Sequence, residues 1–439
     1  MPSPIERVVV INDDCVPSGG AAAIALASME ELRSRGIAVT MITGDGGANP
    51  DVGRLGADLV AFGGRHILEG GRPAILRGLY SRSAASRLSA WIAKNDTPGT
   101  IYHLHNWHKF LSPAAFVPLR RVAHRLVLCA HDYFLACPNG GYFHFPRGEI
   151  CNRSPMGAAC LMAQCDKRNY AHKLWRVARS AVRHLAMDLH NTSATVLAVH
   201  EGMIPLLAQS IDRRSIRVLR NPASPWLPSR VTAELNHRLL FVGRLEQDKG
   251  VMHLARAARI AGAPLRIIGA GPLAPVIRCD FPEVELAGWK PKTEIAKLCR
   301  DARAVVMPSQ WRETFGLVAI EAAMSGIPVI VSRAALISGD LERLGAGIGC
   351  DGHDVTAMAK TITRIMSDDA LVADMSQCGF DSARSLAPTP QEWGDQLIAL
   401  YEEKLAGAKP ADSRSQARAS SGHGGAVAYP SARMQRGTR

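Results

Sequence analysis

The 439-residue sequence predicts an α/β protein with two domains, each built on a doubly wound parallel sheet. Short apolar runs of β-prone residues alternate with helical patterns along most of the chain. Aromatic residues make up only 5% of the sequence while aliphatic residues and alanine are frequent, as in proteins with buried parallel strands. A segment rich in proline and serine, 221–236, separates two alternating halves and is the predicted hinge.

The first predicted domain covers residues 1–220, and an insert covers 133–166. Uninterrupted apolar runs indicate buried strands, and longer runs with helical spacing indicate the helices between them. The expected strands are 7–11, 38–43, 57–62, 100–104, 125–130, 195–199 and 215–219, and the expected helices are 21–35 and most of 75–95.

The second predicted domain covers residues 237–386. Its expected strands are 238–242, 265–268, 303–307 and 327–331. A last segment, 387–406, carries an amphipathic helix over 390–404. The remainder, 407–439, consists mostly of Ser, Ala, Gly and Arg and is predicted to be a disordered basic tail.

Two glutamates follow the predicted strand 303–307. Glu313 lies in the loop after this strand, and Glu321 lies on the next helix with seven residues between them. Such loops form the ligand-binding edge of a doubly wound sheet. The helix start offers free N–H groups to a phosphate, and carboxylates accept hydrogen bonds from sugar hydroxyls. The segment therefore predicts a nucleotide-sugar site, although two solvated glutamates on a surface helix would show the same spacing.

A second strand, loop and helix supply two cations. Strand 238–242 continues into Gly243-Arg-Leu-Glu-Gln-Asp-Lys-Gly250, and a helical pattern begins at Val251. Arg244 offers a bidentate fork and Lys249 a point charge, which together suit a diphosphate. The alternative is a solvated loop at the domain surface.

These segments resemble the family 4 retaining glycosyltransferases, which have the GT-B fold of two Rossmann-like domains facing across a cleft. The glutamates match the Glu-x7-Glu signature, and the cations match Gly-Arg-x4-Lys-Gly. The resemblance implies that Glu313 contacts the donor sugar and Glu321 the ribose, while Arg244 and Lys249 bind the diphosphate. It also implies diphosphate contacts at Phe315, Gly316 and Leu317, and nucleoside contacts at the glycine turn of Gly269 and Gly271.

The loop after the first strand contains Gly19 and Gly20. Glycines there permit a tight turn and close approach of a ligand to a helix N-terminus. The family has a glycine-rich loop at this place, near the donor phosphates, and the resemblance implies the same contact here. A plain strand-to-helix turn is the alternative.

Histidines follow two neighbouring strands of the first domain. His131 follows strand 125–130, where the family places a histidine against the donor sugar, so the resemblance makes it a catalytic residue together with Glu313. His105 follows strand 100–104 and is expected to line the cleft. A metal site of His103, His105 and His108 is the weaker alternative, because no acidic residue is paired with them.

The chain contains no Asp-x-Asp motif, which the metal-dependent class of glycosyltransferases would use to hold a divalent ion on the diphosphate. Arg244, Lys249 and helix dipoles are expected to neutralise the leaving group instead. No cofactor is therefore expected for catalysis. The family resemblance implies transfer with retention, in which the leaving diphosphate deprotonates the acceptor hydroxyl, so no nucleophile is assigned.

Four of the ten cysteines lie in the insert: Cys137, Cys151, Cys160 and Cys165. Four soft ligands over this length can hold a structural zinc or an iron–sulfur cluster. Their spacing lacks paired Cys-x2-Cys motifs, so free structural cysteines and redox pairs remain open. Because they lie in a long irregular segment, a structural role is expected rather than a catalytic one.

The segment after the insert, 166–190, is basic and helical. Its cations are Lys167, Arg168, Lys173, Arg176, Arg179 and Arg183, and its apolar stripe is Trp175, Val182 and Leu185. Such a helix can rest on an anionic membrane, or it can be solvated with its stripe in the core.

A formal net charge of +13 favours anionic partners: nucleotide sugars, anionic lipid headgroups or nucleic acid. No nucleic-acid motif supports the last of these. No run of about 18 apolar residues is present, and the chain starts without a signal-peptide pattern. The expected location is therefore the cytoplasm, where the protein can also bind peripherally to the cytoplasmic face of the membrane.

The expected function is transfer of a hexose, with retention and without metal, from a UDP or GDP sugar to a glycan or lipid-linked acceptor. Synthesis of cell-surface or extracellular polysaccharide is the expected setting. Two alternatives use the same fold. One is a hydrolase or epimerase of nucleotide sugars, and the other is a non-catalytic nucleotide-sugar-binding subunit of a polysaccharide assembly complex.

Overall fold

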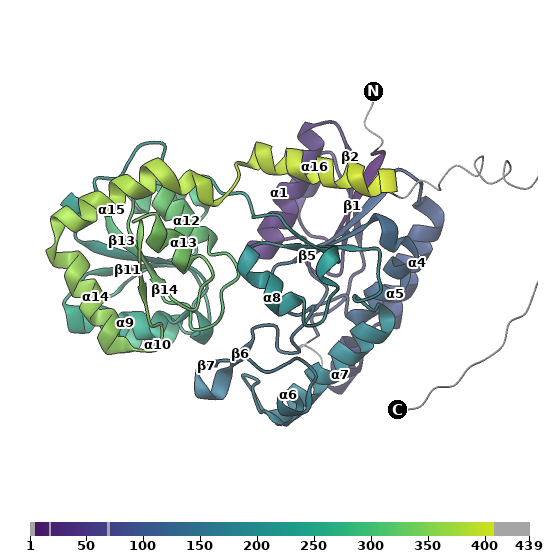
Figure 1. The fold of residues 1–439 in the computed structure, drawn as a ribbon, viewed down its shortest axis with the longest axis horizontal. Helices are drawn as coiled ribbons and strands as arrows, with labels where there is room; N and C mark the ends of the chain where they lie inside the picture. Colours follow the sequence, from purple (N-terminus) through teal and green to yellow (C-terminus); the bar gives the residue numbers. More distant parts are fainter. Residues whose placement is uncertain (1–4, 17–18, 68–70, 408–439) are drawn as a thin grey trace, which may run out of the picture.

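The computed structural model describes residues 5–16, 19–67 and 71–407. It contains two parallel sheets, each covered by helices on both faces (Figure 1), so the predicted α/β class with two Rossmann-like domains is confirmed. The predicted tail lies outside the described residues, apart from Gly407 at the end of the last helix.

The first sheet has seven strands in the order β3-β2-β1-β4-β5-β8-β9. The strands are β1 Arg7–Asn12, β2 Ala38–Thr43, β3 Asp58–Ala61, β4 Thr100–Leu104, β5 Leu126–Ala130, β8 Thr195–Ala198 and β9 Ile216–Val218. The helices of this part are α1 Gly20–Ser34, α2 Pro50–Arg54, α3 Gly71–Leu79, α4 Arg82–Asn95, α5 Phe116–Leu119 and α8 Ile204–Leu207. Every strand pair in this sheet is parallel, so all strand-to-helix loops emerge at one edge.

The second sheet has six parallel strands in the order β12-β11-β10-β13-β14-β15. They are β10 Arg238–Val242, β11 Leu265–Ile268, β12 Glu285–Gly288, β13 Ala302–Met307, β14 Val329–Ser332 and β15 Gly347–Cys350. The helices are α9 Val251–Ala261, α10 Ala274–Asp280, α11 Lys292–Leu298, α12 Leu317–Met324, α13 Ser338–Arg343, α14 Val355–Ser367 and α15 Asp369–Ser382. The sequence did not predict β12 and β15, because these edge strands contain glycine and lack a continuous apolar run.

The last helix, α16 (Pro390–Gly407), leaves the second domain and packs on α1 of the first (Figure 1). Its buried face consists of Trp393, Leu397, Tyr401 and Leu405, which share a hydrophobic cluster with strand and helix residues of the first domain. The Tyr401 hydroxyl lies 2.7 Å from Nδ1 of His103, which is buried in β4. The last helix of the described residues therefore packs on the first domain.

Replacing Leu397 with alanine is expected to destabilise the protein by about 2 to 5 kcal/mol, because a fully buried leucine would leave a cavity between α16 and α1. Urea unfolding measures this, with Gln396→Ala on the exposed face of α16 as the matched control. Equal stability of the two variants would show that α16 does not pack on the first domain in solution.

The segment 221–236, predicted as a hinge, is packed on the second domain for most of its length. Trp226 donates its backbone N–H to Ser325 Oγ at 2.9 Å, and Val231 donates to the Ser325 carbonyl at 3.0 Å. The chain crosses between domains before this contact and again near Pro388, where the two crossings join through Ala223 N–H and the Pro388 carbonyl at 3.1 Å.

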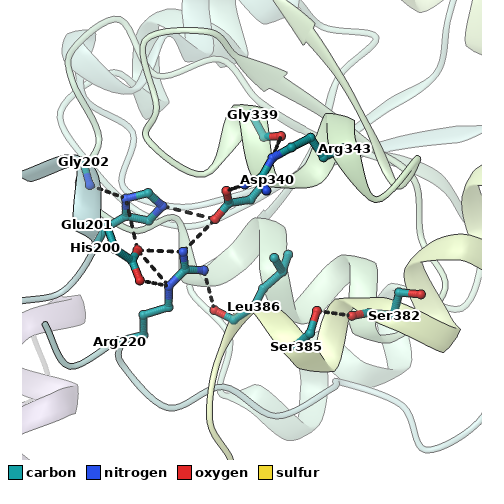
Figure 2. A network of polar contacts seen from close by, with 10 residues as sticks. All are labelled: His200, Glu201, Gly202, Arg220, Gly339, Asp340, Arg343, Ser382, Ser385 and Leu386. Carbon is teal, nitrogen blue, oxygen red and sulfur yellow. Dashed lines mark hydrogen bonds and ion pairs between the residues drawn. The ribbon is translucent and has the colours of Figure 1, made fainter.

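A polar network lies beside this crossing (Figure 2). Arg220 pairs with Glu201 of the first domain at 2.7 Å and with Asp340 of α13 at 2.9 Å. His200 lies 3.2 Å from the same Asp340 carboxylate, and Arg220 also donates to the Leu386 carbonyl at 3.0 Å. These contacts tie the first domain, the crossing and the second domain at one point.

The insert has little regular structure of its own. It contains the hairpin β6 (Phe143–His144) and β7 (Glu149–Ile150) and the short helix α6 (Ala158–Met162), and it leads into α7 (Tyr170–Ala186). In Figure 1 it forms the lower part of the molecule, with β6 and β7 on the side of the second domain.

Helix α7 packs on the protein through its cationic residues. This differs from both expectations, which were contact with an anionic membrane or a solvated helix with its apolar stripe in the core. Lys173, Arg179 and Arg183 are buried, whereas Leu185 of the predicted apolar stripe is 78% exposed. The Arg179 guanidinium lies over the rings of Trp107 and Trp175, so cation–π contact and its apolar stem replace aliphatic packing. Among the described residues, no helix has both the length and the apolar character needed to cross a bilayer.

Candidate active site

The loops after β10 and β13 bring two predicted site residues into direct contact. These strands are neighbours and run parallel, so both loops emerge at the same edge. Lys249 Nζ lies 2.5 Å from Glu313 Oε2, which also accepts a hydrogen bond from Ser309 Oγ at 3.1 Å. Lys249 lies over the ring of Trp311, 5.4 Å from its centre. The cation and the carboxylate therefore form one unit.

The first domain adds two histidines to this unit. Thr314, next to Glu313, donates its hydroxyl to the backbone carbonyl of His131 at 2.8 Å. The His131 Nε2 atom lies 3.0 Å from Nδ1 of His105, and the two rings stack. The structure thus places four predicted residues, one from each of four loops, at the place where the domains meet.

Burial determines the charge state of these histidines. It lowers the pKa of His131 to about 4, and it holds the pKa of His105 well below its ordinary value. Both rings are therefore neutral near pH 7. A neutral imidazole can donate and accept hydrogen bonds to sugar hydroxyls, but it adds no charge to the site.

Two aspartates at this edge, the buried Asp13 and the half-buried Asp132, were not among the predicted site residues. Asp13, which follows β1, accepts backbone N–H bonds from Lys109, Phe110 and Leu111 at 2.7, 2.9 and 3.0 Å. It thereby fixes the loop after β4 that begins with His105. The sequence signal that could have identified Asp13 is the Asn-Asp-Asp run directly after a buried strand.

The second of these is Asp132, beside His131. Burial raises the pKa of the Asp132 carboxyl to about 6, although its Oδ1 accepts the Phe134 N–H at 2.8 Å. A carboxyl group with this pKa can exchange a proton near neutral pH.

Asp132→Asn is expected to stabilise the protein by about 1 to 3 kcal/mol near pH 7, because the amide keeps the acceptor for Phe134 without a buried charge. The folded pKa of about 6 exceeds the unfolded value of about 3.9, so the folded state binds this proton more tightly. The cost in wild type therefore grows from pH 4 to pH 6 and is complete above it. Urea unfolding at several pH values measures the difference, and an offset that is equal at all pH values would contradict this origin.

Arg244 lies apart from the Lys249–Glu313 unit. Its side chain is 53% exposed and pairs with Glu246 at 2.7 Å. A flexible, exposed guanidinium can swing to an anionic ligand, but the structure does not place it beside Lys249. Its role in the diphosphate clamp remains a prediction.

The glycine turn after β11 braces the Arg244 loop. A Cβ atom at Gly269 would lie 1.8 Å from the Gly243 carbonyl oxygen, and one at Gly271 would lie 2.6 Å from that of Leu245. Leu245 N–H also donates to the Ala270 carbonyl at 2.9 Å. Close backbone packing by itself therefore requires both glycines, and the predicted nucleoside contact has no separate support from this geometry.

Glu321 is half-buried on α12 and already has two partners. It accepts Trp226 Nε1–H at 3.0 Å and pairs with Lys292 at 2.6 Å. Gly316 starts this helix with a φ of 84°, and Ala319 N–H bonds to its carbonyl at 3.0 Å. Phe315 is buried, and Leu317 packs against both hydrophobic clusters, the larger of which spans the two domains. For Glu321, Phe315, Gly316 and Leu317 the structure shows packing contacts and the geometry of a helix start. Their contacts with the ribose and the diphosphate stay predictions.

Neither Gly19 nor Gly20 has the left-handed backbone for which a tight turn would require glycine. Gly19 has an extended backbone with φ of −179°, which any residue adopts, and it is the N-cap of α1. A Cβ atom at either glycine would meet no other atom within 4 Å. The glycines therefore leave open space at the start of α1 rather than relieve backbone strain.

One potential metal-ligand group includes His105 of this site. Among the described residues, ligand atoms of His103, His105 and Cys129 lie within 4.8 Å of one another. His108, which the sequence placed in such a group, is not part of it. Nε2 of His103 and of His105 has no hydrogen-bond partner within the described part of the chain.

Comparison with known proteins gives this site its class. The sequence pattern of the family described as "Glycosyl transferases group 1" matches residues 229–381. A glycogen synthase of Mycobacterium tuberculosis is 30% identical over 314 residues, which cover 66% of this chain and 71% of that protein. A D-inositol 3-phosphate glycosyltransferase of Corynebacterium glutamicum is 29% identical over 223 residues, which cover 46% of this chain and 50% of that protein.

Solved structures share the fold at low identity. Sucrose-phosphate synthase from Thermosynechococcus elongatus has a TM-score of 0.67 at 18% identity and covers 92% of this chain and 100% of its own. HepE from Anabaena, solved with UDP-glucose, has a TM-score of 0.61 at 17% identity and covers 91% and 99%.

Two facing Rossmann-like domains with this loop chemistry define a glycosyltransferase of the GT-B fold. The chain belongs to the glycosyl transferases group 1 family.

Proposed function

We propose that this glycosyltransferase transfers a hexose, with retention and without a divalent metal, from a nucleoside diphosphate sugar to a glycan or lipid-linked acceptor. Cell-surface or extracellular polysaccharide synthesis is the proposed setting, at the cytoplasmic face of the membrane. The contact between Lys249 and Glu313, joined to His131 through Thr314, is the observation that carries the proposal.

The Lys249 ammonium group has three N–H donors. It donates a hydrogen bond to Glu313 and lies over the Trp311 ring. It can keep one bond to Glu313 while it donates others to a diphosphate. Glu313 can then accept hydrogen bonds from the hydroxyl groups of the sugar, since a carboxylate is a strong acceptor. Charge on the leaving diphosphate is offset by Lys249 and by Arg244 when the latter turns inward.

The UDP ligands in structurally similar proteins support a uridine nucleotide as the donor. HepE structures contain UDP and UDP-glucose, and a TarM structure from S. aureus contains UDP. A UDP sugar is therefore the first donor to test, with a GDP sugar as the second.

A donor panel with purified protein tests the reaction class. Thermal shift with UDP and GDP sugars selects the donor, and NMR of the transferred sugar reads its anomeric configuration. Retention in the presence of chelator is the expected result. Inverted product, or activity that vanishes with chelator and returns with magnesium, would overturn the proposal.

The same assay separates the two alternative functions. Free sugar or an epimer formed without an acceptor would indicate a nucleotide-sugar hydrolase or epimerase. A donor that binds but is never turned over with any membrane or glycan fraction would indicate a binding subunit.

A further inference from the structure

A buried lysine on α7, the helix that follows the insert, has cysteines of the insert as its partners. Lys173 of α7 is completely buried, and its Nζ lies 3.4 Å from Cys160 Sγ and 3.3 Å from Cys165 Sγ. No carboxylate is among the partners that the described residues give this ammonium group. A buried positive charge is costly unless an anion lies beside it.

Two further cysteines close the same group. Cys137 Sγ lies 3.2 Å from Asn139 Oδ1, and the Asn139 amide donates to Cys165 Sγ at 3.3 Å. Cys151 donates its backbone N–H to the Tyr142 carbonyl at 2.7 Å, and Tyr142 lies within electrostatic range of Cys137, Cys151 and Cys160. All four side chains are buried and none forms a disulfide.

Additional cations surround these sulfurs. Arg153 donates to Cys151 Sγ at 3.6 Å, and Arg176 lies close enough to Cys137 and Cys165 to interact electrostatically. Arg176 already pairs with the buried carboxylate of Asp166 at 2.8 Å, whereas the Lys173 ammonium group has the two sulfurs as its partners among the described residues. Cysteine binds soft metals as the thiolate, and a metal–thiolate centre is an anionic partner of the kind that a buried ammonium group requires.

We propose that Cys137, Cys151, Cys160 and Cys165 together ligate a soft-metal centre, with Lys173 as its buried counter-charge. Four thiolates on zinc or on a four-iron cluster leave a net negative centre, which explains a lysine without a carboxylate. The two occupants share this ligand chemistry.

The two occupants differ in the sulfur spacing that they require. Among the described groups, no three of these sulfurs lie within 4.8 Å of one another. Zinc with Zn–S bonds of about 2.3 Å would hold them roughly 3.8 Å apart. Each thiolate of an iron–sulfur cluster binds a different iron, so its sulfurs stand further apart. The amounts of iron and zinc in the purified protein distinguish the two occupants.

The centre would hold a part of the first domain that reaches the second. Asn152 lies 3.3 Å from Arg312, and Lys167 pairs with Asp248 at 3.2 Å. Phe143 stacks on His353 with ring centres 5.6 Å apart. These contacts reach the loops that carry Lys249 and Glu313, so loss of the centre would loosen the insert and weaken domain contact rather than remove a catalytic group.

Metal analysis of protein purified without chelator and without oxygen tests the proposal. Either one zinc per chain, or about four iron with acid-labile sulfide and visible absorption, is expected. Each of the four Cys→Ser variants should lose most of that metal and melt at a lower temperature. Cys279→Ser and Cys378→Ser, at exposed cysteines, are the matched controls and should retain it.

Wild-type protein that contains neither metal and exposes all ten thiols to titration on unfolding would overturn the proposal, even if the variants do not fold. So would four variants with unchanged metal content and melting temperature. Neither result bears on sugar transfer, because the proposed reaction does not use this centre.

Discussion

Glu313→Gln is expected to lower turnover by on the order of 10²-fold while the protein stays folded. The Glu313 carboxylate lies 2.5 Å from Lys249 Nζ. Glutamine keeps the side-chain shape and one hydrogen-bond acceptor but removes the negative charge. Loss of one preorganised polar contact to the reacting sugar costs about 2 to 4 kcal/mol of transition-state stabilisation. Initial rates across the donor panel, with circular dichroism for folding, measure this effect.

Glu294→Gln is the matched control, because Glu294 forms an exposed ion pair with Lys297 on α11. It should keep wild-type rates. Wild-type activity of Glu313→Gln with every donor would show that Glu313 does not contact the sugar.

Lys249→Met is expected to weaken nucleoside diphosphate binding by about 10- to 100-fold and to leave nucleoside binding nearly unchanged. Methionine keeps much of the apolar stem over Trp311 but removes the ammonium group. Charge-assisted hydrogen bonds contribute about 1.5 to 3 kcal/mol each, and the freed Glu313 carboxylate would also repel the phosphates. Calorimetry with uridine measures the affinity for the nucleoside, and calorimetry with UDP measures the affinity for the nucleoside diphosphate.

A double variant sharpens this test. Because Lys249 and Glu313 are in contact, Lys249→Met with Glu313→Gln removes the repulsion and should bind UDP better than Lys249→Met alone. Arg244→Met is the companion variant for the second cation, whose exposed pairing with Glu246 predicts no loss of stability. Equal weakening of uridine and UDP by Lys249→Met would contradict the diphosphate assignment.

The buried strands were the part of the fold that the sequence predicted best. Strands 38–43, 100–104, 238–242 and 265–268 have the bounds that their apolar runs predict. A strand covered on both faces is mostly apolar, so its sequence forms a recognisable run even where it contains a polar residue such as His103 or Arg266. Edge strands β12 and β15 lack that requirement, and their sequences gave no comparable signal.

The candidate site was predictable to the same extent, and for a related reason. Glu313, Lys249, His131 and His105 each follow a central strand, and parallel strands place such loops at one edge. Asp13 and Asp132 were not predicted, because their properties depend on burial and on the backbone N–H groups that they accept. Neither can be read from a short stretch of sequence.

The sequence by itself determined the two-sheet α/β architecture and the edge at which the polar loops meet, because strand periodicity and loop position are local properties. Only the tertiary structure decided which partners the charged residues have when those partners lie far apart in the sequence. It joins Lys249 to Glu313, turns the cations of α7 inward onto Trp107, Trp175 and the cysteines, and carries the insert to the second domain. Such pairings depend on which surfaces exclude water together, and that is a property of packing rather than of any single segment.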